Sequence, residues 1–403
     1  MRGNCSFIIL FGSLIHFGFA YANLYEWQCE RIIGFNAPIA SFASLDLDSN
    51  EYPHLVYTVT DWSGFNGLEH AYKSTTGWQE GQLIDTTVYG YPSVALDKFD
   101  FIHICYVGST GLLKYAYWNG ESLMIETVDD SCNCYCHIVV DTMCHPHISY
   151  RAEPRLKYAV KSDSQWRTVT VDSHSTIGIN NAIFLDGAGN PHIVYVNYYA
   201  SELWYSFYDG STWFNELIVP WFPYHPGCVS LCLDSLDNPH ISFINGQGSP
   251  TGHLMYAFRT QDADWQIDTV NTDYNGAFTS IALDNLGTPC IVYYLDDMGY
   301  YWLSFAIKRE FGWHIEPVDT MDWNHPFYSD NELVLTFNCN NEPHIAYGTG
   351  NDRTTYAHGV RLGIEEESNN LGSHNFFIIP NPFTVSVNIE YELLTAEYVT
   401  LRI

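Results

Sequence analysis

The sequence predicts an all-β fold, a seven-bladed β-propeller closed by a strand from the N-terminus. A pattern recurs about seven times: Leu-Asp, four residues and Pro-His-Ile-x-Tyr, then Leu-x-Tyr-Ala, a polar turn and a Trp-led run ending in Val-Asp. Its first aspartate stands at Asp48, Asp97, Asp141, Asp186, Asp234 and Asp284, with Asn338 in the seventh copy. The copies follow one another at 49, 44, 45, 48, 50 and 54 residues, a period typical of propellers and related arrays.

Each copy predicts four strands, and the fourth copy shows them most clearly. Apolar, β-branched and aromatic runs at 181–185, 191–195, 203–208 and 213–219 are separated by turns rich in Gly, Asn and Asp. No segment after residue 22 has a sustained helical period, so we expect no long helix. Four antiparallel strands repeated radially leave only short, protected sheet edges.

The two ends of the array complement each other. The seventh copy has strand-like runs at 332–337, 343–347 and 354–358 and then stops without its Trp-led run. Residues 27–33 read Trp-Gln-Cys-Glu-Arg-Ile-Ile, spaced like Trp-Arg-Thr-Val-Thr-Val-Asp at 166–172. We expect this N-terminal strand to complete the last blade, because the pairing removes an open sheet edge.

The chain divides into four predicted segments. Residues 1–22 have an early arginine, an apolar stretch and a small-x-small end at Ala20-Tyr21-Ala22, which is typical of a secretory signal peptide. The propeller is expected at 23–360, a polar linker at 361–375 and a further β segment at 376–403. We therefore expect a secreted or cell-surface protein that is not an integral membrane protein after cleavage, and a monomer.

The net charge excludes one class of partner. With 46 acidic residues against 16 Lys and Arg, the formal charge is −30, which repels nucleic acid and anionic membranes. Acidity also keeps an exported protein soluble. No cofactor is expected. The turns at 46–50 and 234–238 offer oxygen ligands for calcium, but the same residues form tight turns, which is the favoured interpretation.

Ten cysteines remain after the signal peptide, and four are close together in the sequence. Cys132, Cys134, Cys136 and Cys144 suggest two local disulfides in an oxidising compartment, with Cys105 as a further candidate partner. Their spacing matches no common zinc site.

A second position of the repeat is histidine in six copies and Cys290 in the other. These histidines are His54, His103, His147, His192, His240 and His344. A catalytic site needs its residue once, whereas a structural role needs it in every blade. We expect a hydrogen bond within each blade between this histidine and the repeat aspartate. The recurrent tryptophans are expected to pack the blades.

Functional residues are expected where the copies differ, in the loops that join strands two and three and that join the blades. Aromatic residues with nearby carboxylates gather there: Trp62, Phe65, Tyr198, Tyr199, Trp221, Tyr224, His225, Asp296, Asp297, Tyr300, Trp323 and His325. Such loops on a rigid scaffold are suited to binding, here a neutral glycan or a surface protein. The alternative is that these aromatics cap the blade ends.

Two further functions stay open. Arg151, Arg155 and Arg353 lie in the variable loops and could clamp a sugar carboxylate, as in a polysaccharide lyase or glycoside hydrolase. Arginine is scarce and no single-copy acid–base set is evident, so we favour a non-catalytic protein without excluding an enzyme. A purely structural or adhesive surface repeat is the other alternative.

The repeat, with blades reading Ser-[Ile/Val]-Ala-Leu-Asp-x-x-Gly-x-Pro-His-Ile-x-Tyr, resembles exported bacterial and archaeal propeller proteins of unassigned role. The resemblance covers residues 24–360 and implies the fold, not an activity. Residues 376–383, Phe-Phe-Ile-Ile-Pro-Asn-Pro-Phe, resemble the start of the Ig-like C-terminal sorting domain of type IX secretion substrates. The chain stops at Ile403, before the Tyr-Asp-x-x-Gly-[Arg/Lys] segment of such domains, so an incomplete domain is expected.

Overall fold

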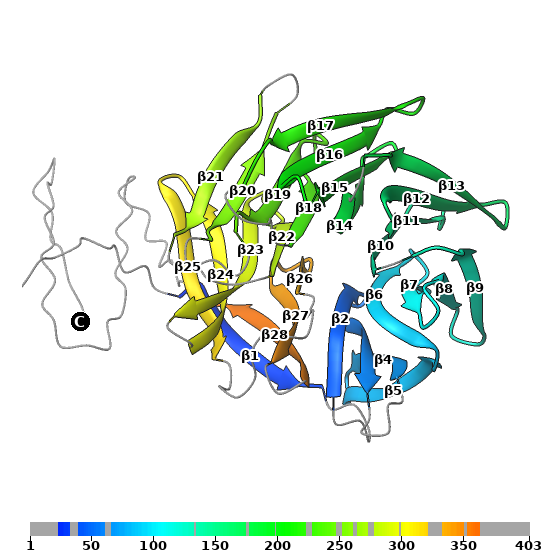
Figure 1. Ribbon diagram of the computed structural model, residues 1–403. Coiled ribbons are helices and arrows are strands. Elements are labelled where there is room, and N and C mark those ends of the chain that lie inside the picture. Colours follow the sequence, from blue (N-terminus) through cyan, green and yellow to red (C-terminus); the bar gives the residue numbers. More distant parts are fainter. Residues whose placement is uncertain are drawn as a thin grey trace, which may run out of the picture. The chain divides into compact units, whose positions relative to one another are not determined.

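A computed structural model describes residues 23–32, 39–60, 66–132, 134–174, 177–197, 199–222, 228–246, 252–260, 264–272, 278–297, 300–320, 333–349 and 353–362. These residues form seven four-stranded antiparallel sheets arranged in a ring, with no helix among them (Figure 1). No helix of the described part is therefore long and apolar enough to cross a membrane. The predicted seven-bladed β-propeller is confirmed. The predicted signal peptide and Ig-like segment lie outside the described residues.

The first four blades follow one another along the chain. Blade 1 contains β2 (Ile39–Leu47), β3 (Pro53–Thr60), β4 (Asn66–Ser74) and β5 (Gly77–Asp85). Blade 2 contains β6 (Val88–Leu96), β7 (Ile102–Gly108), β8 (Leu113–Trp118) and β9 (Leu123–Asp129). Blade 3 contains β10 (Cys134–Val140), β11 (Pro146–Ala152), β12 (Arg155–Ser162) and β13 (Gln165–Asp172). Blade 4 contains β14 (Ile177–Leu185), β15 (Pro191–Asn197), β16 (Glu202–Tyr208) and β17 (Trp213–Val219).

The remaining blades complete the ring. Blade 5 contains β18 (Val229–Leu233), β19 (Pro239–Ile244), β20 (Leu254–Phe258) and β21 (Gln266–Asn271). Blade 6 contains β22 (Thr279–Leu283), β23 (Pro289–Asp297), β24 (Tyr300–Arg309) and β25 (Gly312–Thr320). Blade 7 contains β26 (Val334–Phe337), β27 (Pro343–Thr349), β28 (Arg353–Arg361) and the N-terminal β1 (Tyr25–Arg31).

Blade 7 closes the ring as the sequence predicts. Strand β1 pairs antiparallel with β28, from Tyr25 opposite Arg361 to Arg31 opposite Thr355. The propeller from Tyr25 to Arg361 is one compact unit. Both its ends therefore lie on one rim, which also carries the turns between first and second strands. We call this the regular rim. We call the opposite rim, which has the loops between second and third strands and the blade-to-blade loops, the variable rim.

The repeat aspartate organises the turn between the first two strands. In blade 4, Asp186 Oδ1 accepts the backbone N–H groups of Ala188 (2.9 Å) and Asn190 (2.7 Å). The other blades repeat this cap through Asp48, Asp97, Asp141, Asp234, Asp284 and Asn338. Self-capping by Asp is what makes it a turn residue. Backbone N–H groups of the turns thus donate to these carboxylates. This favours a structural role of the repeat aspartate over calcium binding.

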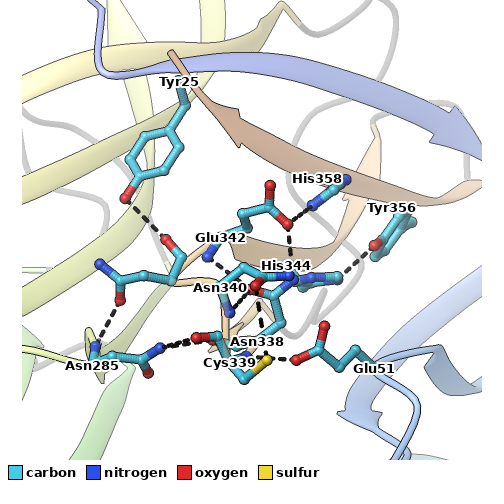
Figure 2. A network of polar contacts seen from close by, with 11 residues as sticks. Tyr25, Glu51, Asn285, Asn338, Cys339, Asn340, Glu342, His344, Tyr356 and His358 are labelled. Carbon is cyan, nitrogen blue, oxygen red and sulfur yellow. Dashed lines mark hydrogen bonds and ion pairs between the residues drawn. The ribbon is translucent and has the colours of Figure 1, made fainter. Parts of the chain in front are cut away.

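Neighbouring turns are also tied to each other on the regular rim. The third residue after the repeat aspartate has a positive φ, for example 68° at Glu51 and 63° at Asn341. In four of the seven turns its side chain accepts a backbone N–H from the adjacent blade, as Glu51 Oε1 does from Cys339 (2.8 Å) (Figure 2) and Asn341 Oδ1 does from Asn285 (2.6 Å). Non-glycine residues are strained in this conformation, and the inter-blade hydrogen bond offsets that strain.

The inner strands of adjacent blades are joined by serine hydroxyls. Ser93 Oγ accepts the backbone N–H of Ile138 in the next blade at 3.2 Å. The same contact recurs between Ser44 and Val94, Ser230 and Ile281, and Ser280 and Leu335. A serine in the Ser-x-Ala-Leu-Asp segment thus satisfies a backbone donor that no strand pairing could reach.

The recurrent tryptophans lie between blades, as expected for packing residues. Trp166 Nε1 donates to Glu126 Oε2 of the preceding blade (3.0 Å), and Lys161 Nζ donates to the same oxygen (2.7 Å). The indole also packs edge-on against Tyr115, with ring centroids 5.1 Å apart. Trp78 contacts Glu30, and Trp27 of β1 contacts Glu316, in the same way.

The repeat histidine has a different main partner from the one expected. In five blades its Nδ1 shares a hydrogen bond with a tyrosine hydroxyl of the third strand, for example His103–Tyr115 at 2.7 Å and His344–Tyr356 at 2.6 Å (Figure 2). The aspartate Oδ2 lies 3.4 to 3.8 Å from Nε2, and only Asp97–His103 is short enough for a hydrogen bond. The aspartate instead uses its strongest contacts to cap the turn.

The expected disulfides are absent among the described cysteines. Cys144 follows the far end of β10, about 23 Å from Cys132 at ~3.3 Å per strand residue, which is beyond disulfide reach. Cys136 Sγ instead donates to the carbonyl oxygen of Tyr91 at 3.3 Å. The side chain of Cys134 lies outside the description.

Candidate functional site

The variable rim carries the candidate binding residues, and two of them are fully described. Tyr199, in the β15–β16 loop, is 72% exposed, and Trp221, after β17, is 66% exposed. Asp296, Asp297 and Tyr300 lie at the rim ends of β23 and β24, with Asp297 opposite Tyr300 and only their backbone described. The other candidates lie outside the described residues: Trp62, Phe65, Tyr198, Tyr224, His225, Trp323 and His325.

A repeated polar cluster lies below this rim. In the junction of blades 2 and 3, Asp129 Oδ2 accepts from Tyr150 Oη (2.6 Å) and from Lys157 Nζ (2.7 Å), while its Oδ1 accepts from Ser131. Burial raises the pKa of Asp129, but the hydrogen bonds from Lys157 and Tyr150 outweigh it and lower the pKa to about 2. Asp85 has the same set of partners one blade earlier.

Blade 4 departs from this pattern at two positions. Trp204 follows Leu203 where Lys157 follows Leu156, and His174 follows Asp172 by two residues where Ser131 follows Asp129. The cluster therefore loses its cation and gains two aromatic rings. The position of Trp204 varies among the blades, and the other six have Glu69, Lys114, Lys157, Met255, Ser304 and Thr355 there. Only blade 4 has an aromatic side chain at this position, so we regard this place as the candidate site.

The two substituted side chains form a stack above a buried carboxylate. His174 and Trp204 have ring centroids 5.7 Å apart and planes inclined by 23°. Asp172, with 2% of its side chain exposed, accepts from His174 Nδ1 (2.6 Å) and from Tyr195 Oη (2.7 Å). Glu202 Oε2 accepts from Trp204 Nε1 at 2.9 Å. Each of the two rings thus donates a hydrogen bond to a carboxylate.

The two exposed aromatic residues belong to the same part of the rim. The backbone N–H of Phe222 donates to the carbonyl of Ser201 at 2.9 Å, which ties the blade 4–5 link beside the β15–β16 loop. Trp221 and Tyr199 are on these two tied segments. We define the blade-4 aromatic site as His174, Tyr199, Trp204 and Trp221 with the carboxylates of Asp172 and Glu202.

The arrangement offers two kinds of chemistry. Exposed aromatic faces beside carboxylate acceptors can bind a ring that has both apolar C–H and hydroxyl groups. His174 offers a second kind, because Asp172 holds its Nδ1–H and so leaves Nε2 as a proton acceptor on a side chain that is 67% exposed. Among the described residues, no three His, Cys, Asp or Glu are grouped so as to hold a metal ion.

Two of the three arginines considered as a carboxylate clamp have described side chains. Arg151 is buried, and its guanidinium forms an ion pair with Glu153 at 2.7 Å. Arg155 is exposed at the start of β12, and only the backbone of Arg353 is described. The guanidinium of Arg151 is therefore engaged within the rim.

The sequence prediction found Tyr199 and Trp221 and missed His174, Trp204, Asp172 and Glu202. These four lie within or next to regular strands, whose sequence pattern predicts the scaffold. The available signal was an aromatic residue at each aligned position: Trp204 aligns with Lys114 and Lys157, and His174 aligns with Thr87 and Ser131.

Comparisons with known proteins give a fold but no family. No family model and no curated protein matches the sequence. The BP39L lectin from Burkholderia pseudomallei is similar in structure, with a TM-score of 0.62, 11% identity, and coverage of 80% of this chain and 98% of the lectin. A polysaccharide lyase, an ulvan lyase bound to -[GlcA(1-4)Rha3S]-, has a TM-score of 0.57 and 12% identity, and the match covers 80% of this chain and 94% of the lyase. A protein of unknown function from Dyadobacter fermentans has a TM-score of 0.52 and 10% identity, and the match covers 83% of this chain and 99% of that protein.

Proposed function

We propose that this protein is an exported carbohydrate-binding propeller that binds a neutral glycan at the blade-4 aromatic site. The observation that carries the proposal is the His174–Trp204 stack beside the buried Asp172, at the place where blades 2 and 3 have a Lys–Asp contact. Tyr199 and Trp221 are exposed on the rim loops of the same blade. Sugar rings present C–H faces to such surfaces, and their hydroxyls need acceptors such as Glu202.

The charge of the protein supports a neutral ligand. Asp172 and Glu202 lie under the site, and the whole chain has a formal charge of −30. An anionic polymer would be repelled by this field unless a local cation compensated. The site has lost the lysine that would supply that cation in blades 2 and 3.

The structural neighbours are consistent with this class of ligand. One is called a lectin, and another is a lyase whose structure contains a saccharide. At 11% and 12% identity they support a propeller scaffold that accommodates saccharide sites, and they leave the ligand of this chain to experiment.

A glycan array probed with the chain from residue 23 onward tests the proposal. We expect a reproducible neutral glycan hit that weakens at least tenfold, about 1.4 kcal/mol, in Trp221→Ala. Phe311→Ala is the matched control, because Phe311 is 90% exposed in the β24–β25 turn on the regular rim. A blank array, together with no captured surface protein, would leave only the structural or adhesive role.

A second candidate function is proton-transfer catalysis on a polysaccharide. The pair of His174 and buried Asp172 favours it, since this arrangement orients an imidazole to act as a general base. Uronate-containing polysaccharides would be screened for new unsaturated ends, and turnover should disappear in His174→Asn. Absence of turnover on every substrate, with glycan binding intact, would leave the binding role alone.

Export and sorting are further parts of the proposal. The signal-like segment before Asn23 supports export, and the segment at 376–383 supports surface sorting. Expression of the full chain in a secreting bacterium, followed by N-terminal sequencing, should give Asn23 as the first residue. Retention of Met1 in the mature protein would contradict export by this signal.

A further inference from the structure

A second concave feature lies at the rim end of blade 2, away from the blade-4 aromatic site. It is a pocket of ≈ 410 Å³. Its walls are Tyr89 from the start of β6, Ser109 and Thr110 from the β7–β8 turn, and Asp130 and Ser131 from the link to blade 3. This volume is near the lower end of the range for small-ligand sites.

Hydrogen bonds fix the walls of the pocket in place. The backbone N–H of Cys132 donates to the carbonyl of Gly111 (2.7 Å), which joins the blade 2–3 link to the β7–β8 turn. The N–H of Ser109 donates to the carbonyl of Thr87 (2.9 Å), which joins the same turn to the start of β6. The pocket is therefore formed before a ligand arrives, which lowers the entropic cost of binding.

The strand that presents the tyrosine is irregular at this place. The register of β6 against β7 shifts between Gly90 and Ser93, and Tyr91 has a φ of 56°. Tyr135 and Asn180, at the equivalent positions of blades 3 and 4, also have positive φ and lie at register shifts, so the irregularity belongs to the scaffold. What distinguishes blade 2 is Tyr89, which is 61% exposed at the pocket and has its ring centroid 6.2 Å from that of Tyr91.

The lining indicates the chemistry of the occupant. It combines one exposed aromatic ring, three hydroxyl side chains, one carboxylate and the smaller residues Val107, Gly111 and Cys132, and no lysine or arginine lines it. The nearby Lys114 has its ammonium group engaged by Asp85 and Thr87. A ligand should therefore be hydroxyl-rich, about one ring in size, and free of negative charge.

We propose that this blade-2 pocket binds a single neutral sugar residue and is a second carbohydrate site, independent of the blade-4 aromatic site. The inference deepens the proposed function, on which it rests for the ligand class. Two separate sites on one rim would let the protein hold a branched or repeating glycan at two points, with an avidity that neither site has alone.

The test uses methyl glycosides of glucose, galactose, mannose and N-acetylglucosamine, with methyl glucuronide as the anionic comparison, titrated by calorimetry and ligand-observed NMR. Tyr89→Ala removes the ring, and Thr110→Trp fills the pocket from an exposed turn position. We expect each variant to weaken at least one neutral glycoside tenfold or more, while Phe311→Ala does not. Methyl glucuronide should not bind.

The outcomes separate the two sites. If Tyr89→Ala and Thr110→Trp lose affinity for a neutral glycoside and Trp221→Ala keeps it, the result supports the pocket. If only Trp221→Ala loses affinity, the pocket proposal is wrong, whereas the proposed function at the blade-4 aromatic site is supported. Binding of none of the neutral glycosides, or preferred binding of methyl glucuronide, would overturn the pocket as well. Thermal denaturation of each variant excludes misfolding as the cause.

Discussion

Acid should destabilise the propeller through its buried histidines, and His70 allows one contribution to be isolated. The third strand of blade 1 reads Leu-Glu-His-Ala where the repeat has Leu-x-Tyr-Ala, so His70 replaces the tyrosine that pairs with the repeat histidine. His70 Nε2 lies 3.0 Å from Nδ1 of His54. Burial, followed by the proximity of His54, lowers the pKa of His70 to about 3.

The sign follows from proton uptake. The folded state keeps His70 neutral, whereas the unfolded chain takes up a proton near pH 6.5. Stability from this residue is therefore complete above pH 6.5 and is lost as the pH falls toward the folded pKa. At pH 5 the free energy of unfolding has fallen by about 2 kcal/mol, because pH 5 lies ~1.5 pH units below the unfolded-state pKa and each unit is worth about 1.36 kcal/mol.

The perturbation is His70→Tyr, which restores the repeat. Urea denaturation would give the free energy of unfolding at pH 7.5 and at pH 5.0 for the unmodified protein and the variant. The unmodified protein should lose about 2 kcal/mol more than His70→Tyr between these pH values. His70→Phe is the control, since it also removes the titration but supplies no hydroxyl to His54. Equal losses in all three proteins would refute the reasoning.

Three further predictions concern the scaffold. His192→Ala should lower the free energy of unfolding by roughly 1–3 kcal/mol, because it strands the buried Tyr205 hydroxyl; lost glycan binding at an unchanged Tm would contradict a structural role. Ser93→Ala should cost about 1 kcal/mol by removing the acceptor of the Ile138 N–H, and an unchanged urea midpoint would argue against the inter-blade tie. Deletion of residues 23–36 removes β1 and should abolish cooperative unfolding, whereas a melt like that of the intact propeller would disprove closure.

The fold could be predicted from the sequence because each blade repeats the same physical requirements. The Leu-Asp turn, the β-branched second strand and the Trp-led fourth strand recur at a nearly fixed period. The closure by β1 was also accessible, since Trp27 begins a run spaced like the fourth strands. Strand ends shifted by a few residues, as in β14, because irregular register at the rim leaves no sequence period.

The partner of the repeat histidine was harder to predict. His192 pairs in register with Phe207, while its hydrogen bond goes to Tyr205, two residues along the third strand. Sequence spacing gives the order of strands but not which diagonal neighbour a side chain meets. The repeat itself shows that the two positions change together. In blade 6, Cys290 stands at the histidine position and Phe305 at the tyrosine position, and both side chains are apolar and buried.

The candidate site was only partly predictable for a related reason. Tyr199 and Trp221 stand in loops, where aromatics attract notice. His174 and Trp204 stand at scaffold positions, and their significance depends on the three-dimensional equivalence with Ser131 and Lys157. The blade-2 pocket depends on backbone ties between three segments, which no motif encodes.

The central claim is that the departures of blade 4 from the repeat create the glycan site. The double variant Trp204→Lys/His174→Ser converts this blade to the arrangement around Asp129 in the preceding junction, so the fold has a native precedent for it. Calorimetric titration of the array-selected glycan should show at least a tenfold weaker Kd at an unchanged Tm. An unchanged Kd in the folded double variant would contradict the claim.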